Sequence, residues 1–187
     1  MNNQIGALIN ALKKENGGHI FYHYQKVESY LQNLITFIMQ GINNGHHVMI
    51  VENDRHIFQI KKFVHKRLNS NSHYISKLHF INNFDFYYSN GDFNPQTVLT
   101  YFLNHIDPFV DKDHTLCTWG HVEWRDSNEI VGKLEEYENE IDRIVNGQGL
   151  ISVCAYDANR TSESLSEALL RCHDVMMKDE EIIWLRR

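Results

Sequence analysis

Histidines and carboxylates follow several apolar runs of the sequence, at the points where strands would end. Glu52 closes the run His47–Glu52, and His121 and Glu123 come just after the run Thr115–Trp119. In an open α/β sheet the loops at the carboxyl ends of the strands converge on one crevice. A carboxylate can orient an imidazole and raise its pKa, so His121 and Glu123 form a candidate acid–base pair.

The surrounding residues favour binding over catalysis. No serine or cysteine lies at an obvious nucleophile position beside the His121–Glu123 pair. Cys154 stands in an apolar run and is predicted to be a small buried residue rather than a reactive thiol. The turn at residues 23–29 contains no glycine, although the phosphate loop GxxxxGK[ST] requires glycines for its backbone to approach the ligand. We therefore expect neither ATP hydrolysis nor another enzymatic activity.

Three histidines are candidate metal ligands. His19 and His23 are four residues apart, which on a strand places them about 13 Å from each other, too far to share one ion. With His121 as the third candidate, the pattern favours histidines that are hydrogen-bonded in the core or exposed at the surface. The sequence therefore predicts no metal site and no cofactor.

Apolar residues at helical spacing indicate a short amphipathic helix over residues 3–14. Ile5, Leu8, Ile9 and Leu12 would form its apolar side, and Gly17 and Gly18 end the pattern. This helix can cover a sheet edge or bind a partner. We divide the chain into this N-terminal helix, residues 1–16, and a single domain over residues 17–187.

The rest of the chain alternates between short apolar strands and amphipathic helices. Such alternation predicts a mostly parallel sheet with helices on both faces, which is an α/β fold of three layers, because right-handed crossovers place helices above and below the sheet. The predicted strands are residues 19–24, 47–52, 78–81, 115–119 and 150–156, and the predicted helices include 127–146 and roughly 162–177, before a last apolar segment at 182–185.

The predicted helix over residues 127–146 is rich in glutamate. Most of this acidity indicates a face exposed to solvent. Glu138, however, follows Tyr137, which the helical spacing places towards the core. We therefore expect Glu138 to turn inward.

Composition limits the partners and the compartment. The net charge of −6 and the pI near 6.0 argue against direct binding of nucleic acid, which needs a concentrated basic face. Three widely spaced cysteines fit neither a disulfide framework nor a zinc knuckle and indicate reduced thiols in the cytoplasm. No stretch is long and apolar enough for a signal sequence or a membrane span, so no membrane association is expected.

Several stretches together resemble a known family. They are HIFY at residues 19–22, FIMQGINNGHHVMIVEND, YYSNGDFNPQTVL, GHVEW, LEEYENEID and VCAYD, followed by His173. Over about residues 17–176 the chain is similar to the MEDS domain (methanogen/methylotroph, DcmR sensory domain), which resembles RecA- and KaiC-type ATPases without the phosphate loop. The family's characteristic residues would be His19, Tyr22, Gly91, Phe93, Glu123, Trp124, Tyr137, Glu138, Cys154, Tyr156, Asp157 and His173.

The resemblance implies a RecA-like sensory domain that binds a small organic ligand in the former nucleotide crevice. It would act through a separate regulatory protein such as a kinase or a transcription factor, and a homodimer is expected by analogy with RecA-like assemblies. The predicted ligand-binding residues are His19, Tyr22, His23, Tyr24, Glu52, His121, Glu123, Trp124, Tyr137, Tyr156, Asp157 and His173.

Two other functions compete with this one. In the first, the domain is a protein-interaction adaptor whose N-terminal helix or edge strand recruits the partner. Deleting residues 1–16 would then remove the complex and leave the core folded. In the second, the chain is a divergent nucleotide-dependent or metal-dependent hydrolase. A lack of ATP binding would exclude this hypothesis.

Overall fold

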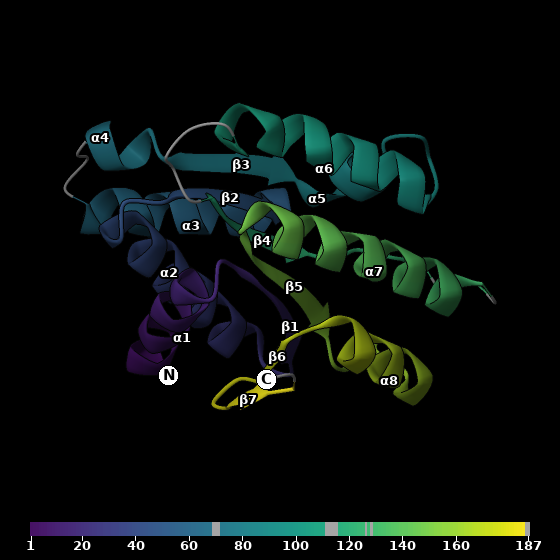
Figure 1. Cartoon of the computed structure of the whole chain (residues 1–187). Coiled ribbons are helices and arrows are strands. Elements are labelled where there is room, and N and C mark those ends of the chain that lie inside the picture. Colours follow the sequence, from purple (N-terminus) through teal and green to yellow (C-terminus); the bar gives the residue numbers. More distant parts are fainter. Residues whose placement is uncertain (69–71, 111–115, 126, 128, 186–187) are drawn as a thin grey trace.

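A computed structural model describes residues 1–68, 72–110, 116–125, 127 and 129–185. The chain forms three layers, in which a central sheet carries helices on both of its faces (Figure 1). The predicted fold class is confirmed.

Within the described residues, the sheet has seven strands in the order β3-β2-β4-β5-β1-β6-β7. They are β1 (Gly18–Tyr24), β2 (His47–Glu52), β3 (Leu78–Asn82), β4 (Leu116–His121), β5 (Ile151–Asp157), β6 (Val175–Met177) and β7 (Ile182–Trp184). All neighbours are parallel except β6 and β7, which pair antiparallel at one edge. The strand order places β4 between β2 and β5, so segments distant in the sequence meet at the centre of the carboxyl edge.

The helices complete the predicted alternation and add two short elements, at residues 72–75 and 83–87, that the spacing did not indicate. The helices are α1 (Asn2–Lys14), α2 (Val27–Asn43), α3 (Asp54–Arg67), α4 (Ser72–Ile75), α5 (Asn83–Tyr87), α6 (Pro95–Val110), α7 (Ile130–Gln148) and α8 (Glu163–Cys172). Helices α1, α2 and α3 cover one face of the sheet, and α5, α6, α7 and α8 pack on the other (Figure 1).

Asn53 caps helix α3 by accepting a hydrogen bond from the backbone N–H of His56. Thr115, the predicted start of a strand, and residue 128 of the predicted helix 127–146 lie outside the described residues.

The predicted helix over residues 162–177 is wrong over its last five residues, 173–177. Helix α8 ends at Cys172, and β6 begins at Val175. The backbone N–H of Asp174 donates to His19 O, and the Asp174 carboxylate accepts from the N–H of His19, each at 2.9 Å. These bonds hold the chain extended along β1, and this long-range pairing outweighs the helical spacing of the local sequence.

The N-terminal helix α1 belongs to the core of the domain. Ile5, Leu8, Ile9 and Leu12 are at most 5% exposed and pack in the same apolar cluster as α2. Gly17 joins α1 to β1 at a φ of 112°, and a Cβ there would lie 2.5 Å from Leu150 O. Only glycine fits this turn, and the turn places α1 against the sheet.

Strand alternation decides which residues can share a site. In β1, Phe21 lies in the cluster beneath α6, α7 and α8, whereas Ile20 and Tyr22 lie in the cluster beneath α1, α2 and α3. Among the described residues, no helix is long and apolar enough to cross a membrane.

Candidate functional site

The predicted ligand-binding residues do not line one crevice, because the sheet separates them. Tyr22, Tyr24, Glu52 and His121 lie on the face covered by α2 and α3. His19, Tyr137, Tyr156 and His173 lie on the face covered by α7 and α8, and Glu123, Trp124 and Asp157 lie at or after the ends of β4 and β5. These positions come from the strand registers, the apolar clusters and the side-chain contacts. Among the predicted ligand-binding residues, the aromatic side chains of Tyr22 and Tyr24 are therefore separated from those of Trp124 and Tyr156 by the sheet.

A polar network occupies the carboxyl ends of β2 and β4, and we call it the edge network. It consists of Tyr24, Tyr30, Glu52, His56 and His121. His121 Nδ1 lies 2.7 Å from Glu52 Oε1, and the Tyr24 hydroxyl lies 2.9 Å from His121 Nε2. The Tyr30 hydroxyl donates to Glu52 Oε2. A carboxylate that is fully removed from water is thus held by an imidazole and a phenol.

The edge network leaves Glu52 ionised. Burial alone would raise the pKa of Glu52, but hydrogen bonds from His121, His56 and Tyr30 lower it to about 2. The backbone N–H of Asn53 adds a bond of 2.7 Å to Glu52 Oε1. Imidazoles, a phenol and a backbone amide therefore stabilise the negative charge.

Aromatic side chains and partly exposed histidines surround the Glu52 carboxylate. Trp119 Nε1 donates to the Tyr30 hydroxyl at 3.1 Å, and the Tyr24 and Tyr30 rings lie 4.5 Å apart between centroids. The His121 side chain is 12% exposed and the His56 side chain 16%. Sequence reasoning missed Tyr30, His56 and Trp119 as members, and only the position of Trp119 two residues before His121 pointed towards this group.

Glu123 is not the partner of His121. Its carboxylate accepts from Arg160 Nη1 at 2.9 Å, and the Arg160 guanidinium lies 4.3 Å from the centroid of the Trp124 ring. Arg160 also donates to Trp124 O. The predicted acid–base pair is therefore wrong, because Glu123 follows the end of β4 and turns towards the loop after β5.

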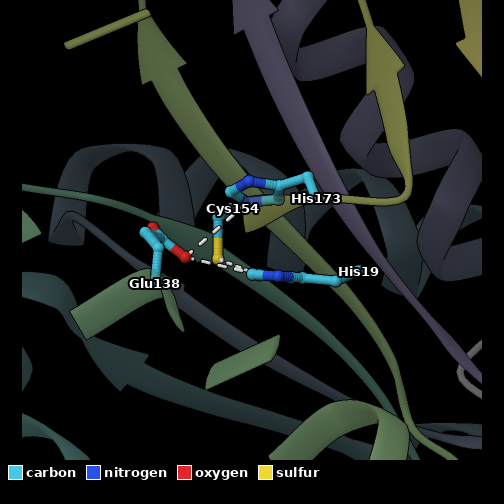
Figure 2. A group of neighbouring side chains, drawn as sticks. All are labelled: His19, Glu138, Cys154 and His173. Atoms are coloured by element: carbon cyan, nitrogen blue, oxygen red, sulfur yellow. Dashed lines mark hydrogen bonds and ion pairs between the residues drawn. The ribbon is translucent and has the colours of Figure 1, made fainter. Parts of the chain in front are cut away.

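A second polar group is buried on the other face of the sheet, and we call it the buried cluster (Figure 2). It consists of His19 from β1, Glu138 from α7, Cys154 from β5 and His173 after α8, all fully or almost fully buried. His19 Nε2 lies 3.3 Å from Glu138 Oε2, and His173 Nε2 lies 3.6 Å from the same oxygen. The Tyr156 hydroxyl donates to Glu138 Oε1. The expectation that Glu138 turns inward is confirmed.

Burial and the neighbouring side chains together set the charges in this cluster. It raises the pKa of the Cys154 thiol to about 12 and lowers the pKa of His173 to about 3. Burial would also raise the pKa of Glu138, but the His19 and His173 imidazoles and the Tyr156 hydroxyl hold it below its usual value. Glu138 is therefore a buried carboxylate like Glu52, stabilised by imidazoles and a phenol.

The turn after β1 binds a carboxylate of the chain itself. The backbone N–H groups of Gln25 and Lys26 donate to the two oxygens of Asp179 at 3.3 and 3.1 Å. The Tyr22 hydroxyl adds a bond of 3.2 Å to the same side chain. His23 lines a cavity of about 370 Å³ beside this turn. The amides that follow β1 thus contact the β6–β7 connection.

The arrangement of the sheet and helices is similar to that of an ATPase domain. A solved structure of an ATPase domain matches this chain with a TM-score of 0.56 over 87% of this chain and 69% of that one. The two sequences are 7% identical, so the similarity concerns the fold alone. A search of the curated proteins found no match to this sequence.

The sequence itself identifies the family. The model of the MEDS domain, "MEthanogen/methylotroph, DcmR Sensory domain", matches residues 18–174. The chain therefore belongs to the MEDS family of sensory domains, and the resemblance found in its motifs is confirmed.

Proposed function

We propose that this chain is a non-catalytic sensory domain that binds a small organic ligand at the edge network and signals to a separate protein. One observation carries the proposal. Glu52 is an ionised carboxylate, buried at the carboxyl edge of the sheet, and partly exposed histidines separate it from solvent. In α/β sheets this edge is where ligands bind.

The residues indicate the chemical class of the ligand. An ionised carboxylate attracts hydrogen-bond donors and cations, and aromatic rings add apolar area and cation–π attraction. Tyr30 donates to Glu52, its ring lies next to that of Tyr24, and Trp119 donates to the Tyr30 hydroxyl. A small amine or alcohol therefore fits better than a carboxylate or a phosphate.

A ligand bound at Glu52 can signal to the protein surface through helices α2 and α3. Tyr30 lies in α2 and His56 in α3, so a ligand that replaces either contact to Glu52 changes how these helices meet the sheet. A groove of about 630 Å³ lies along the same two helices, lined in part by Met39 and Phe63. We propose this surface as the contact with a regulatory protein such as a kinase or a transcription factor.

An adaptor without a ligand is the second candidate function. It is favoured by Phe58, which is 72% exposed on α3, and by Phe63 at 44%. Exposed phenylalanines on one helix are typical of a protein-binding surface. In this alternative, Phe58→Ser abolishes the partner complex, and no small molecule changes the stability of the domain or the affinity for the partner.

We expect small amines or alcohols to raise the melting temperature of the full chain. A ligand at 100 times its Kd stabilises the native state by about 2.7 kcal/mol, which for a domain of this size is roughly 5–10 °C. Differential scanning calorimetry with a panel of short-chain amines, alcohols and carboxylates checks this. The carboxylates should give no increase.

The matched variants are Glu52→Gln and Glu140→Gln. The first replaces the carboxylate of the edge network, and the second replaces a glutamate on the surface of α7 that pairs with Arg143. Glu52→Gln should abolish the increase, whereas Glu140→Gln should keep it in full. If both variants respond as the wild type does, the ligand binds elsewhere and the proposal is wrong.

A further inference from the structure

The buried cluster of His19, Glu138, Cys154 and His173 has the composition of a metal site. Separate segments of the chain bring together two imidazoles, a thiol and a carboxylate, and one ligand atom from each lies within 4.8 Å of all the others (Figure 2). We propose that this cluster binds one divalent transition metal of the zinc type. The proposal uses none of the residues of the edge network, so it can fail or succeed independently of the proposed function.

The donor set matches such an ion, and so do the three distances between ligand atoms that follow. Zinc and similar metals prefer histidine nitrogen and cysteine sulfur together with carboxylate oxygen, whereas calcium and magnesium take oxygen alone. In a tetrahedral site with metal–ligand bonds of about 2.0–2.3 Å, ligand atoms lie about 3.3–3.8 Å from each other. His19 Nε2 lies 3.3 Å from both Glu138 Oε2 and Cys154 Sγ, and His173 Nε2 lies 3.6 Å from Glu138 Oε2.

In both histidines Nε2 faces Glu138, and Nδ1 faces a backbone carbonyl oxygen. His19 Nδ1 lies 3.2 Å from Cys172 O, and His173 Nδ1 lies 2.7 Å from Leu169 O. A carbonyl oxygen only accepts, so each Nδ1 carries a proton in these contacts, and in the neutral imidazole each Nε2 is then left with a lone pair. Metal-binding histidines are usually held by acceptors in this way.

The cluster is short of hydrogen-bond donors. Tyr156 satisfies Glu138 Oε1, but Glu138 Oε2 and His173 Nε2 are buried without a hydrogen-bond partner among the described residues. A buried acceptor that lacks a donor is costly. A proton on His19 Nε2 would satisfy Glu138 but would still leave His173 Nε2 without a donor, whereas a metal ion accepts lone pairs from all four groups.

The edge network differs in this respect and therefore carries no such proposal. Glu52, His56 and His121 also place ligand atoms within 4.8 Å of one another. There, however, Glu52 Oε1 accepts from the N–H of Asn53 and pairs with His121 Nδ1, and His121 Nε2 pairs with the Tyr24 hydroxyl. Both oxygens of Glu52 have hydrogen-bond partners in this network, so no orphaned acceptor there points to a metal ion.

Titration of the metal-free full chain with Co²⁺ tests the proposal. We expect one Co²⁺ per chain and a thiolate-to-cobalt absorption band, because a coordinating thiol loses its proton even when burial has made it a weak acid. Cys154→Ser should abolish the band and weaken binding by at least roughly tenfold, as the loss of even an outer-shell partner does in known sites. His173→Asn should also weaken binding.

Cys117→Ser is the matched control. Cys117 is also buried, but it belongs to the apolar cluster on the opposite face of the sheet, so this variant should keep the band and the affinity. If the Cys154 variant fails to fold, X-ray absorption of the zinc-loaded wild type should still show one sulfur at about 2.3 Å among nitrogen and oxygen ligands. A wild type that binds neither Co²⁺ nor Zn²⁺, or binds them without sulfur, overturns the proposal.

Discussion

A chain that lacks residues 1–16 is expected to be largely unfolded under conditions where the full chain is native. The deletion removes Ile5, Leu8, Ile9 and Leu12, each buried in the apolar cluster that α1 and α2 share. Truncating one such side chain to alanine typically costs about 2–5 kcal/mol, so the loss of four approaches the roughly 5–15 kcal/mol that stabilises a whole domain. Urea denaturation followed by circular dichroism measures the loss.

Two single substitutions serve as references for this experiment: Leu12→Ala at a buried position and Lys13→Ala at an exposed one. Leu12→Ala should lower the free energy of unfolding by about 2–5 kcal/mol, and Lys13→Ala should change it by less than about 0.5 kcal/mol. A deletion variant that keeps the stability of the full chain would show that α1 is a detachable arm. That result would favour the form of the adaptor hypothesis in which the N-terminal helix recruits the partner.

Stability should fall steeply in acid because of Glu52. Its pKa is about 2 in the folded protein, against an ordinary value of 4.5, so the unfolded chain takes up the proton first. The stabilisation is therefore complete above about pH 5 and is lost as the pH falls towards about 2. The difference amounts to about 3 kcal/mol, which urea denaturation between about pH 6 and pH 2 would measure.

Glu52→Gln isolates this contribution from that of the other carboxylates. The variant should be less stable near neutral pH, because a neutral amide cannot replace the carboxylate beside His121 and Tyr30. Its stability should then decline less steeply in acid than that of the wild type. Identical pH profiles for the two proteins would show that Glu52 is not an ionised, hydrogen-bonded group in the folded state.

The order of strands and helices could be predicted because apolar runs and helical spacing are local properties of the sequence. The runs at residues 47–52 and 150–156 became β2 and β5 almost unchanged. The last five residues of the predicted helix 162–177 could not be predicted, because their structure depends on distant contacts. Their pairing with β1 depends on bonds between His19 and Asp174, which are 155 residues apart.

The site could be predicted only in part, because the face of each residue depends on the strand register. Tyr22 and Tyr156 were both assigned to one crevice, but β1 and β5 pair His23 with Tyr156, which places Tyr22 on the other face. The pair of Glu52 and His121 required knowledge that β2 and β4 are neighbours. Likewise, the motifs that contain His19, Cys154 and His173 gave no indication that these side chains meet.

The most direct test of the sensory proposal is the emission of Trp119, which donates to Tyr30 within the edge network. A variant with Trp124→Phe and Trp184→Phe retains Trp119 as the only tryptophan of the chain. Titration with the amine or alcohol that stabilises the wild type should change this emission in a saturable way, with the Kd found by calorimetry. Stabilisation without any change in Trp119 emission would place the ligand elsewhere and contradict the account.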